Sequence, residues 1–215
     1  NKTISDDIPT ACTNGRDEMY GRAFVDSLTD AELRFLMLHE CYHKMYRHLT
    51  TWRHLHDKSH DLANRACDYN INGRLVDENK DDDFAAMPRN ADGKQIGLYD
   101  DKFRDGTGWY DPATIFKILD DEGEGEGEGE GGNESGGDDS QGTSCAQGQG
   151  LDEHDWDGAN ELSDSEVKEL EKEIDVAIRQ GCMVAGKLGA EGNRNIAELM
   201  QPQVDWREVL REFVQ

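Results

Sequence analysis

The sequence predicts a mostly helical α+β fold, and three observations support this prediction. Helix-capping residues precede helical patterns at four places in the chain. Two short segments that flank Asn14-Gly15 have the pattern of a β-hairpin. No apolar run exceeds four residues, whereas a membrane-spanning helix needs about 20, so no membrane-spanning segment is expected.

A small hairpin and one long helix are expected near the N-terminus. Residues 8–13 and 19–25 would form the two arms of the hairpin. Thr29 and Glu32 form a capping box, so the helix would begin at about Asp30. Apolar residues then recur at helical spacing, which extends the helix to about His54: Leu38, Tyr42, Met45, Leu49 and Trp52.

A second helix is expected from about Ser59 to Asn72, where Gly73 would end it. Because the link between the two helices is short, we expect them to pack antiparallel. Later helices are expected where further capping pairs stand, at Asp111-Pro112 through Leu119, at Ser163 with Glu166, and at Asp205 with Glu208.

Acidic residues concentrate in one part of the chain. The 215 residues include 47 Asp and Glu but 23 Lys and Arg, and the formal charge of −24 disfavours nucleic acid or an anionic membrane as a partner. Residues 120–150 contain 11 of the 23 glycines and a Glu-Gly alternation, which predicts a disordered acidic linker. A calcium-binding loop is the alternative, but its DxDxDG pattern is missing. The linker would join a core, 1–119, to a C-terminal helical segment, 151–215, that packs on the core.

The five cysteines are an odd number and include no CxxC pair. Such a set favours a reducing compartment over an oxidised scaffold, so a cytoplasmic location is expected. Cys41 and Cys67 are interpreted as small buried residues rather than as metal ligands or nucleophiles.

The first long helix contains His39-Glu40-Cys41-Tyr42-His43, an HExxH motif. Positions four apart share one face of a helix, so both imidazoles can reach a single cation, typically zinc. Glu40 lies on the adjoining flank, where a carboxylate can deprotonate a water molecule as a general base. The alternative is that these residues are only the polar edge of a structural helix.

A catalytic zinc site typically has three protein ligands, so a third must come from elsewhere. The second predicted helix carries a polar stripe that includes Asp68 and Asn72. Asp68 is favoured as the third ligand because it lies in the middle of the helix beside Cys67 and an apolar surface. Asn72 would then lie behind the ligands and orient Asp68.

His48 is the competing third ligand. It follows His39 by nine residues, which places it on the opposite side of a continuous helix. A break soon after His43 would remove this objection, but no glycine is present to break the helix. The histidines at 54, 56 and 60 are expected to be mostly solvated, with one of them serving the metal as the alternative.

These residues also resemble a known family, the "putative metallopeptidase domain" that commonly precedes a von Willebrand A-like domain in bacterial and phage proteins. The resemblance covers most of the chain outside the linker, and its most specific part is HExxH followed by AxDxxIN. The similar segments are Thr13 to Arg16, Phe24 to Leu28, Leu38 to His43 with Arg47-His48, Ala66 to Asn72, Gly97 to Phe103 and Val204 to Leu210.

The resemblance implies a zincin-like fold, in which a small N-terminal sheet covers the HExxH helix and an edge strand holds an extended peptide. It also implies that His39 and His43 are zinc ligands, that Glu40 is the general base and that Asp68 is the third ligand.

We therefore expect a zinc-dependent hydrolase, and specifically a metallopeptidase that acts on peptides or proteins. One alternative is a non-catalytic, zinc-stabilised interaction module whose partner is an AAA-type ATPase or a phage component. Another is a metal-free helical scaffold in which the motif arose by chance.

Overall fold

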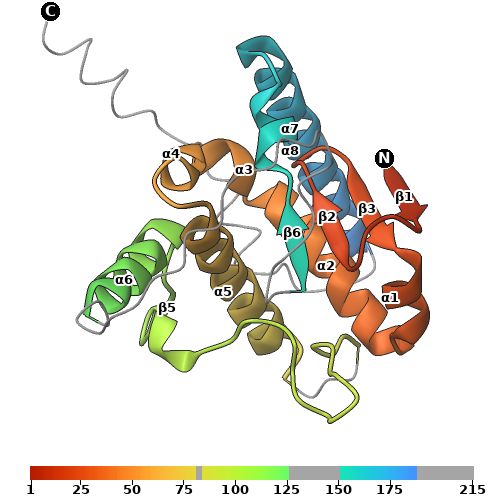
Figure 1. Ribbon diagram of the computed structural model, residues 1–215. Helices are drawn as coiled ribbons and strands as arrows, with labels where there is room; N and C mark the ends of the chain where they lie inside the picture. The colour runs from red at the N-terminus through yellow and green to blue at the C-terminus, as the bar shows by residue number, and fades with distance from the viewer. Residues whose placement is uncertain (81–83, 126–150, 188–215) are drawn as a thin grey trace, which may run out of the picture. The chain divides into compact units, whose positions relative to one another are not determined.

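The computed structural model describes residues 1–80, 84–125 and 151–187 (Figure 1). It divides into two compact units, Asn1–Val167 and a second unit that begins at Lys168. The strands are β1 (Lys2–Ser5), β2 (Ala11–Thr13), β3 (Glu18–Gly21), β4 (Arg104–Asp105), β5 (Gly108–Trp109) and β6 (Asp152–His154). The helices are α1 (Arg22–Ser27), α2 (Asp30–Met45), α3 (His48–Thr51), α4 (Arg53–His56), α5 (His60–Glu78), α6 (Pro112–Gly125), α7 (Trp156–Asn160) and α8 (Asp164–Lys187), with a 3₁₀ turn at Asp101–Phe103. The predicted mostly helical α+β class is confirmed.

The main sheet has the strand order β1-β3-β2-β6. Strands β2 and β3 form the predicted antiparallel hairpin. In its turn Gly15 has φ +82°, and Asn14 Oδ1 accepts hydrogen bonds from the backbone N–H groups of Arg16 (3.0 Å) and Asp17 (2.7 Å). The second arm is shorter than expected, because the chain turns into α1 at Arg22.

Strand β6 joins this sheet from the far end of the first unit. It lies beside β2 and runs parallel to it (Figure 1). In this pairing Asp152 lies opposite Ala11, and His154 lies opposite Thr13. Residues 152–154 were expected within a helical segment, and the structure instead places them in the sheet. The division into core, linker and C-terminal segment stays a prediction, since 126–150 and the helix expected after Asp205 lie outside the described residues.

Helix α2 begins with the predicted capping box of Thr29 and Glu32 but ends earlier than expected, at Met45. Arg47 adopts the left-handed conformation (φ 53°, ψ 41°), and the short helices α3 and α4 follow it. The prediction of one helix to His54 is therefore wrong. A non-glycine residue in this conformation costs about 1–2 kcal/mol, so no local pattern predicts a break at Arg47.

Helix α5 begins where expected, with the Ser59 side chain as a cap that accepts a hydrogen bond from the N–H of Leu62, but it continues past Gly73 to Glu78. Gly73 is needed for packing rather than for ending the helix, because the ring of Trp109 lies directly against it. The capping interactions predicted at Asp111 and at Ser163 with Glu166 are confirmed at the starts of α6 and α8. Helix α6 extends to Gly125, beyond the boundary expected at residue 119.

Helices α2 and α5 pack antiparallel, as expected, since His39 meets Asn72 while His43 meets Asp68. Helix α5 is covered on two sides. One buried apolar cluster lies between α5 and α6, and another lies between α5, α2 and the sheet. The polar residues of α5 are therefore enclosed between these two apolar clusters. Across the described ranges, no helix is both long and apolar enough to span a bilayer.

The contact between Gly73 and Trp109 predicts a specific loss of stability. In Gly73→Ala, the added Cβ would lie 2.3 Å from the Trp109 ring, so the variant should lose about 1–3 kcal/mol of unfolding free energy through overpacking. Gly123→Ala is the matched control, because no atom lies within 4 Å of a Cβ at that helical position. Denaturant unfolding followed by circular dichroism would measure both; equal stability of the two variants would contradict the packing role of Gly73.

Candidate metal centre

The two histidines of the HExxH motif lie on the face of α2 that meets α5, and both are fully buried. Their Nε2 atoms are 3.0 Å apart. From α5, Oδ1 of Asp68 approaches to 3.5 Å from His43 Nε2 and 3.8 Å from His39 Nε2. The structure thus brings together the three side chains that the sequence singled out as a ligand set.

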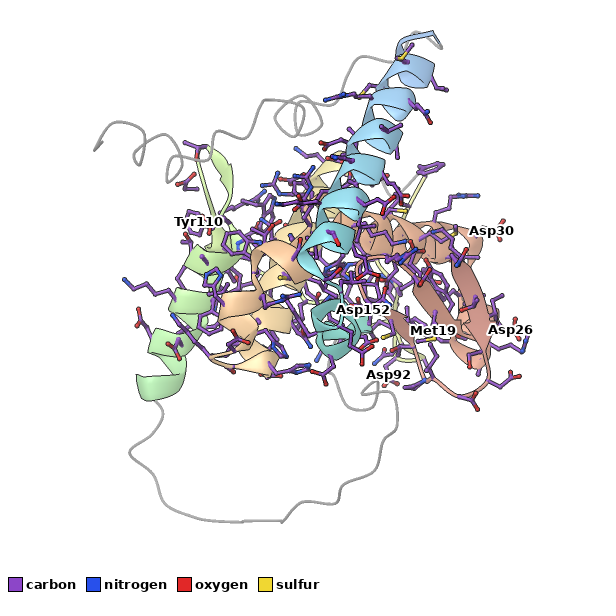
Figure 2. The ribbon with its side chains drawn as sticks, turned by 90° about the horizontal axis from the view of Figure 1, so that it is seen from above. Met19, Asp26, Asp30, Asp92, Tyr110 and Asp152 are labelled. Atoms are coloured by element: carbon purple, nitrogen blue, oxygen red, sulfur yellow. The ribbon has the colours of Figure 1, made fainter. Side chains whose placement is uncertain are left out.

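Strand β6 adds two side chains that the sequence analysis missed. Asp152 and His154 alternate along the strand and so point to the same side of the sheet. Asp152 Oδ1 lies 3.0 Å from His39 Nε2, and His154 Nε2 lies 3.1 Å from His43 Nε2 and 3.7 Å from Asp68 Oδ1. In Figure 2, Asp152 lies among the packed side chains, whereas Asp26 and Asp30 stand at the periphery.

The donor atoms of His39, His43, Asp68 and Asp152 all lie within 4.8 Å of one another, as expected of a group that can hold a metal ion. Donors bound to zinc at about 2.0–2.1 Å in tetrahedral geometry are about 3.3 Å apart, close to the separations here. Oδ1 of Asp68 and Oδ2 of Asp152 are buried and lack a hydrogen-bond partner among the described residues. Such atoms are costly to bury unless a cation or proton satisfies them. The residues therefore fit a divalent metal.

Asn72 fixes the proton of His39 on one ring nitrogen. The amide Nδ2 of Asn72 donates to the carbonyl oxygen of Leu98 (3.0 Å), so its Oδ1 must accept from Nδ1 of His39 (2.8 Å). The Nε2 atom of His39 then faces the other donors. Asn72 was expected to orient Asp68, and the structure shows that it contacts His39 instead.

His48 lies beside the cluster rather than on the opposite side of the helix. The chain reverses at Arg47, and Nδ1 of His48 comes within 3.3 Å of Nδ1 of His43. The geometric objection to His48 assumed a continuous helix and is therefore wrong. Its contact is with Nδ1 of His43, so His48 lies next to a candidate ligand.

His154 is oriented from α5 as well. Nε1 of Trp156 is a donor only, so its 2.5 Å contact identifies Asn64 Oδ1 as an acceptor. The same oxygen lies 2.9 Å from His154 Nδ1, which must therefore carry a proton. Asn64, Asp68 and Asn72 are spaced four residues apart and form one stripe along α5, which we call the α5 polar stripe.

The electrostatics of the metal-free cluster are those of a crowded, buried site. Burial lowers the pKa of His39, but Asp152, Asp68 and Asn72 together outweigh burial and raise this pKa to about 9. Burial would raise the pKa of Asp152, but His39 and His154 hold it at about 2. Burial lowers the pKa of His154 to about 4. His39 and Asp152 thus form an ion pair, and a metal ion binding here has to displace the proton between them.

Glu40 is fully buried next to the cluster. Neither carboxylate oxygen reaches hydrogen-bonding geometry with a partner in the described part of the chain. Burial raises the pKa of Glu40 well above its usual value, and the charge of Asp152 raises it further. A nearby cation would act in the opposite direction and favour the ionised carboxylate.

Another buried carboxylate, Glu18 on β3, belongs to a charge network close to Glu40. The ammonium groups of Lys2 and Lys44 each lie 2.5 Å from Glu18, and the Tyr20 hydroxyl donates to it at 2.5 Å. Burial raises the pKa of Glu18, but hydrogen bonds from Lys2, Lys44 and Tyr20 together outweigh burial and lower this pKa. Glu18 is thereby neutralised by its neighbours, whereas Glu40 has no comparable ion pair among the described residues.

The remaining predicted candidates lie away from the cluster. His54 and His60 are exposed, as expected, whereas His56 is half-buried and stacks on Trp156 with ring centroids 5.0 Å apart. Cys67 is fully buried, in agreement with its interpretation as a small buried residue, and Cys41 is partly buried.

One sequence signal could have indicated the β6 residues. Asp152-Glu153-His154 presents two possible ligands at the period of a strand, and His154 is the only histidine outside residues 39–60. The segment has no apolar alternation, however, so hydrophobic patterning does not predict a strand there.

The donor cluster predicts that a divalent metal stabilises the protein. Zinc added to metal-free protein should raise the unfolding temperature, with about 2.7 kcal/mol of stabilisation at a free concentration of 100 times Kd. The double variant His39→Ala/His43→Ala should lose this shift. His54→Ala/His60→Ala should retain it because both side chains are exposed. Thermal unfolding would measure the shift, and equal responses of the two double variants would rule out metal binding by the HExxH histidines.

Comparison with known proteins identifies a family. No curated protein and no solved structure matches the chain. A family model described as "putative metallopeptidase domain" matches residues 2–215, in agreement with the resemblance seen in the sequence and with the buried His and Asp cluster. The chain therefore belongs to this putative metallopeptidase domain family.

Proposed function

We propose that this protein is a zinc-dependent hydrolase that cleaves peptide bonds. The observation that carries the proposal is the convergence of His39, His43, Asp68 and Asp152 at a buried site beside Glu40. Membership in the putative metallopeptidase domain family supports the same reaction class.

The donor chemistry favours zinc. Calcium and magnesium take oxygen ligands, whereas imidazole suits zinc and other late first-row metals. Two imidazoles with one or two carboxylates are a frequent ligand set of catalytic zinc. The identity of the metal is part of the proposal.

His39, His43 and Asp68 would hold the ion, and Asn72 would keep Nε2 of His39 directed at it. When bound, zinc would polarise the carbonyl of the scissile bond and lower the pKa of a water molecule. Glu40 would accept a proton from that water on a carboxylate oxygen. It would then deliver the proton to the nitrogen of the leaving amine.

Access is the main requirement that this geometry imposes on catalysis. His39, Glu40 and His43 have no exposed surface, so a peptide can reach them only if a covering segment moves. Strand β6 is an edge of the sheet and carries site residues. Binding of an extended peptide along an edge strand, which the family resemblance implied, is retained as a proposal.

Replacing Glu40 tests the catalytic assignment. Glu40→Gln should retain zinc, because residue 40 is not among the proposed ligands, and should lower the rate of peptide cleavage by at least about 100-fold through loss of the general base. Cleavage of a proteome-derived peptide library by zinc-loaded protein, read by mass spectrometry, would give the rate. Elemental analysis would give the zinc content.

Glu78→Gln is the matched control, since Glu78 accepts a hydrogen bond from Tyr42 at the far end of α5 and lies outside the cluster. This variant should cleave at the wild-type rate. Full activity of Glu40→Gln would rule out its role as the base.

A non-catalytic, zinc-stabilised interaction module is the second candidate, and the burial of every donor favours it. In that case removal of zinc would unfold the protein, while the zinc-loaded protein would cleave no peptide of the library. An AAA-type ATPase is the proposed partner for this alternative. Cytoplasmic location remains a prediction from the cysteine content.

A further inference from the structure

Strand β6 is held at the donor cluster by main-chain bonds that do not involve a metal. It pairs with β2 over three residues, and the N–H of Asp155 donates to the carbonyl oxygen of Thr13 (2.9 Å). Asp155 then caps α7 through the N–H of Gly158 (2.8 Å). The position of His154 is therefore set from both sides along the chain.

The side chain of His154 satisfies the requirements of a metal ligand. It is 1% exposed, and Asn64 fixes its proton on Nδ1. Its Nε2 atom lies 3.0 and 3.1 Å from the two ring nitrogens of His43 and 3.4 Å from Asp152 Oδ2. Because Nδ1 of a neutral imidazole carries the only proton, Nε2 presents a lone pair to these atoms.

Of the three histidines, His39 and His154 share one arrangement, in which Nδ1 meets an asparagine of α5, Asn72 or Asn64. Nδ1 of His43 instead lies between His48 (3.3 Å) and Nε2 of His154 (3.0 Å). The Nε2 atoms of His39, His43 and His154 lie 3.8, 3.5 and 3.7 Å from Asp68 Oδ1, which lacks a hydrogen-bond partner in the described ranges. Metal-binding histidines are typically held as His39 and His154 are, with one ring nitrogen hydrogen-bonded and the other free for the ion.

We propose that His154 is a ligand of the metal and that Asn64 is its positioning residue. This inference rests on the proposed function, since it requires that the cluster binds zinc. It assigns one further ligand of the ion to β6, a segment more than 80 residues after Asp68 in the chain, and leaves a fifth position for a water molecule. The metal would then fasten β6 to α2 and α5 in addition to the main-chain bonds.

Zinc affinity of Asn64 variants tests the positioning role. Asn64→Leu removes the acceptor of the His154 proton and should weaken zinc binding about 10–100-fold. Asn64→Asp keeps an oxygen at that position and should retain most of the affinity. Competition with a chromophoric chelator would give the Kd, at a temperature where each variant is folded by circular dichroism.

Asn70→Leu is the matched control. Asn70 is a buried asparagine of the same helix, and its amide donates to the carbonyl oxygen of Tyr110 (2.7 Å) instead of contacting the cluster. This variant should lose stability but keep the wild-type Kd. Equal Kd values for the leucine variants at 64 and 70 would overturn the positioning role of Asn64.

X-ray absorption at the zinc edge tests the ligand directly in the unmodified protein. We expect scattering from three imidazoles in the wild type and from two in His154→Ala. Two imidazoles in the wild type, with tight zinc binding, would overturn the inference and leave the proposed function intact. Failure of the wild type to bind zinc would overturn both.

Discussion

The structure depends on placing three imidazoles and two carboxylates in contact where water does not reach them. Isolated charges and unpaired lone pairs are expensive in such a place, and removing one partner from a buried set leaves the rest uncompensated. Without a metal, the proton between His39 and Asp152 supplies part of the compensation. A divalent cation would satisfy several of these groups at once, so folding and metal binding draw on the same interactions.

Helix α5 provides the scaffold for this cluster. Its polar stripe places Asp68 among the donors and one asparagine on either side of it, each holding the outer nitrogen of a different histidine. The rest of the helix is packed between two apolar clusters, and Gly73 allows Trp109 to lie against the backbone. Packing on both sides restricts movement of the stripe, which is what precise positioning of ligands requires.

Local patterns in the sequence predicted the parts of the fold that local forces determine. The capping box at Thr29, the hairpin at Asn14-Gly15 and the proximity of His39, His43 and Asp68 all follow from short-range geometry. The break at Arg47 does not follow from short-range geometry, because only tertiary contacts can maintain a non-glycine residue in the left-handed region. Strand β6 does not follow from local patterns either. Its residues Asp152 and His154 are polar and are buried in the donor cluster rather than in an apolar core.

The parallel pairing of β2 with β6 also has a consequence for biosynthesis. Two strands separated by about 140 residues can meet only after the whole intervening sequence has left the ribosome, and closing so large a loop carries an entropic penalty that local helices do not face. The α2 and α5 pair can therefore form early, during translation, with its histidines still accessible to solvent. A metal ion that binds at that stage binds before β6 pairs with β2. The order of these two events would determine whether the ion enters an open site or has to reach a site that β6 already covers.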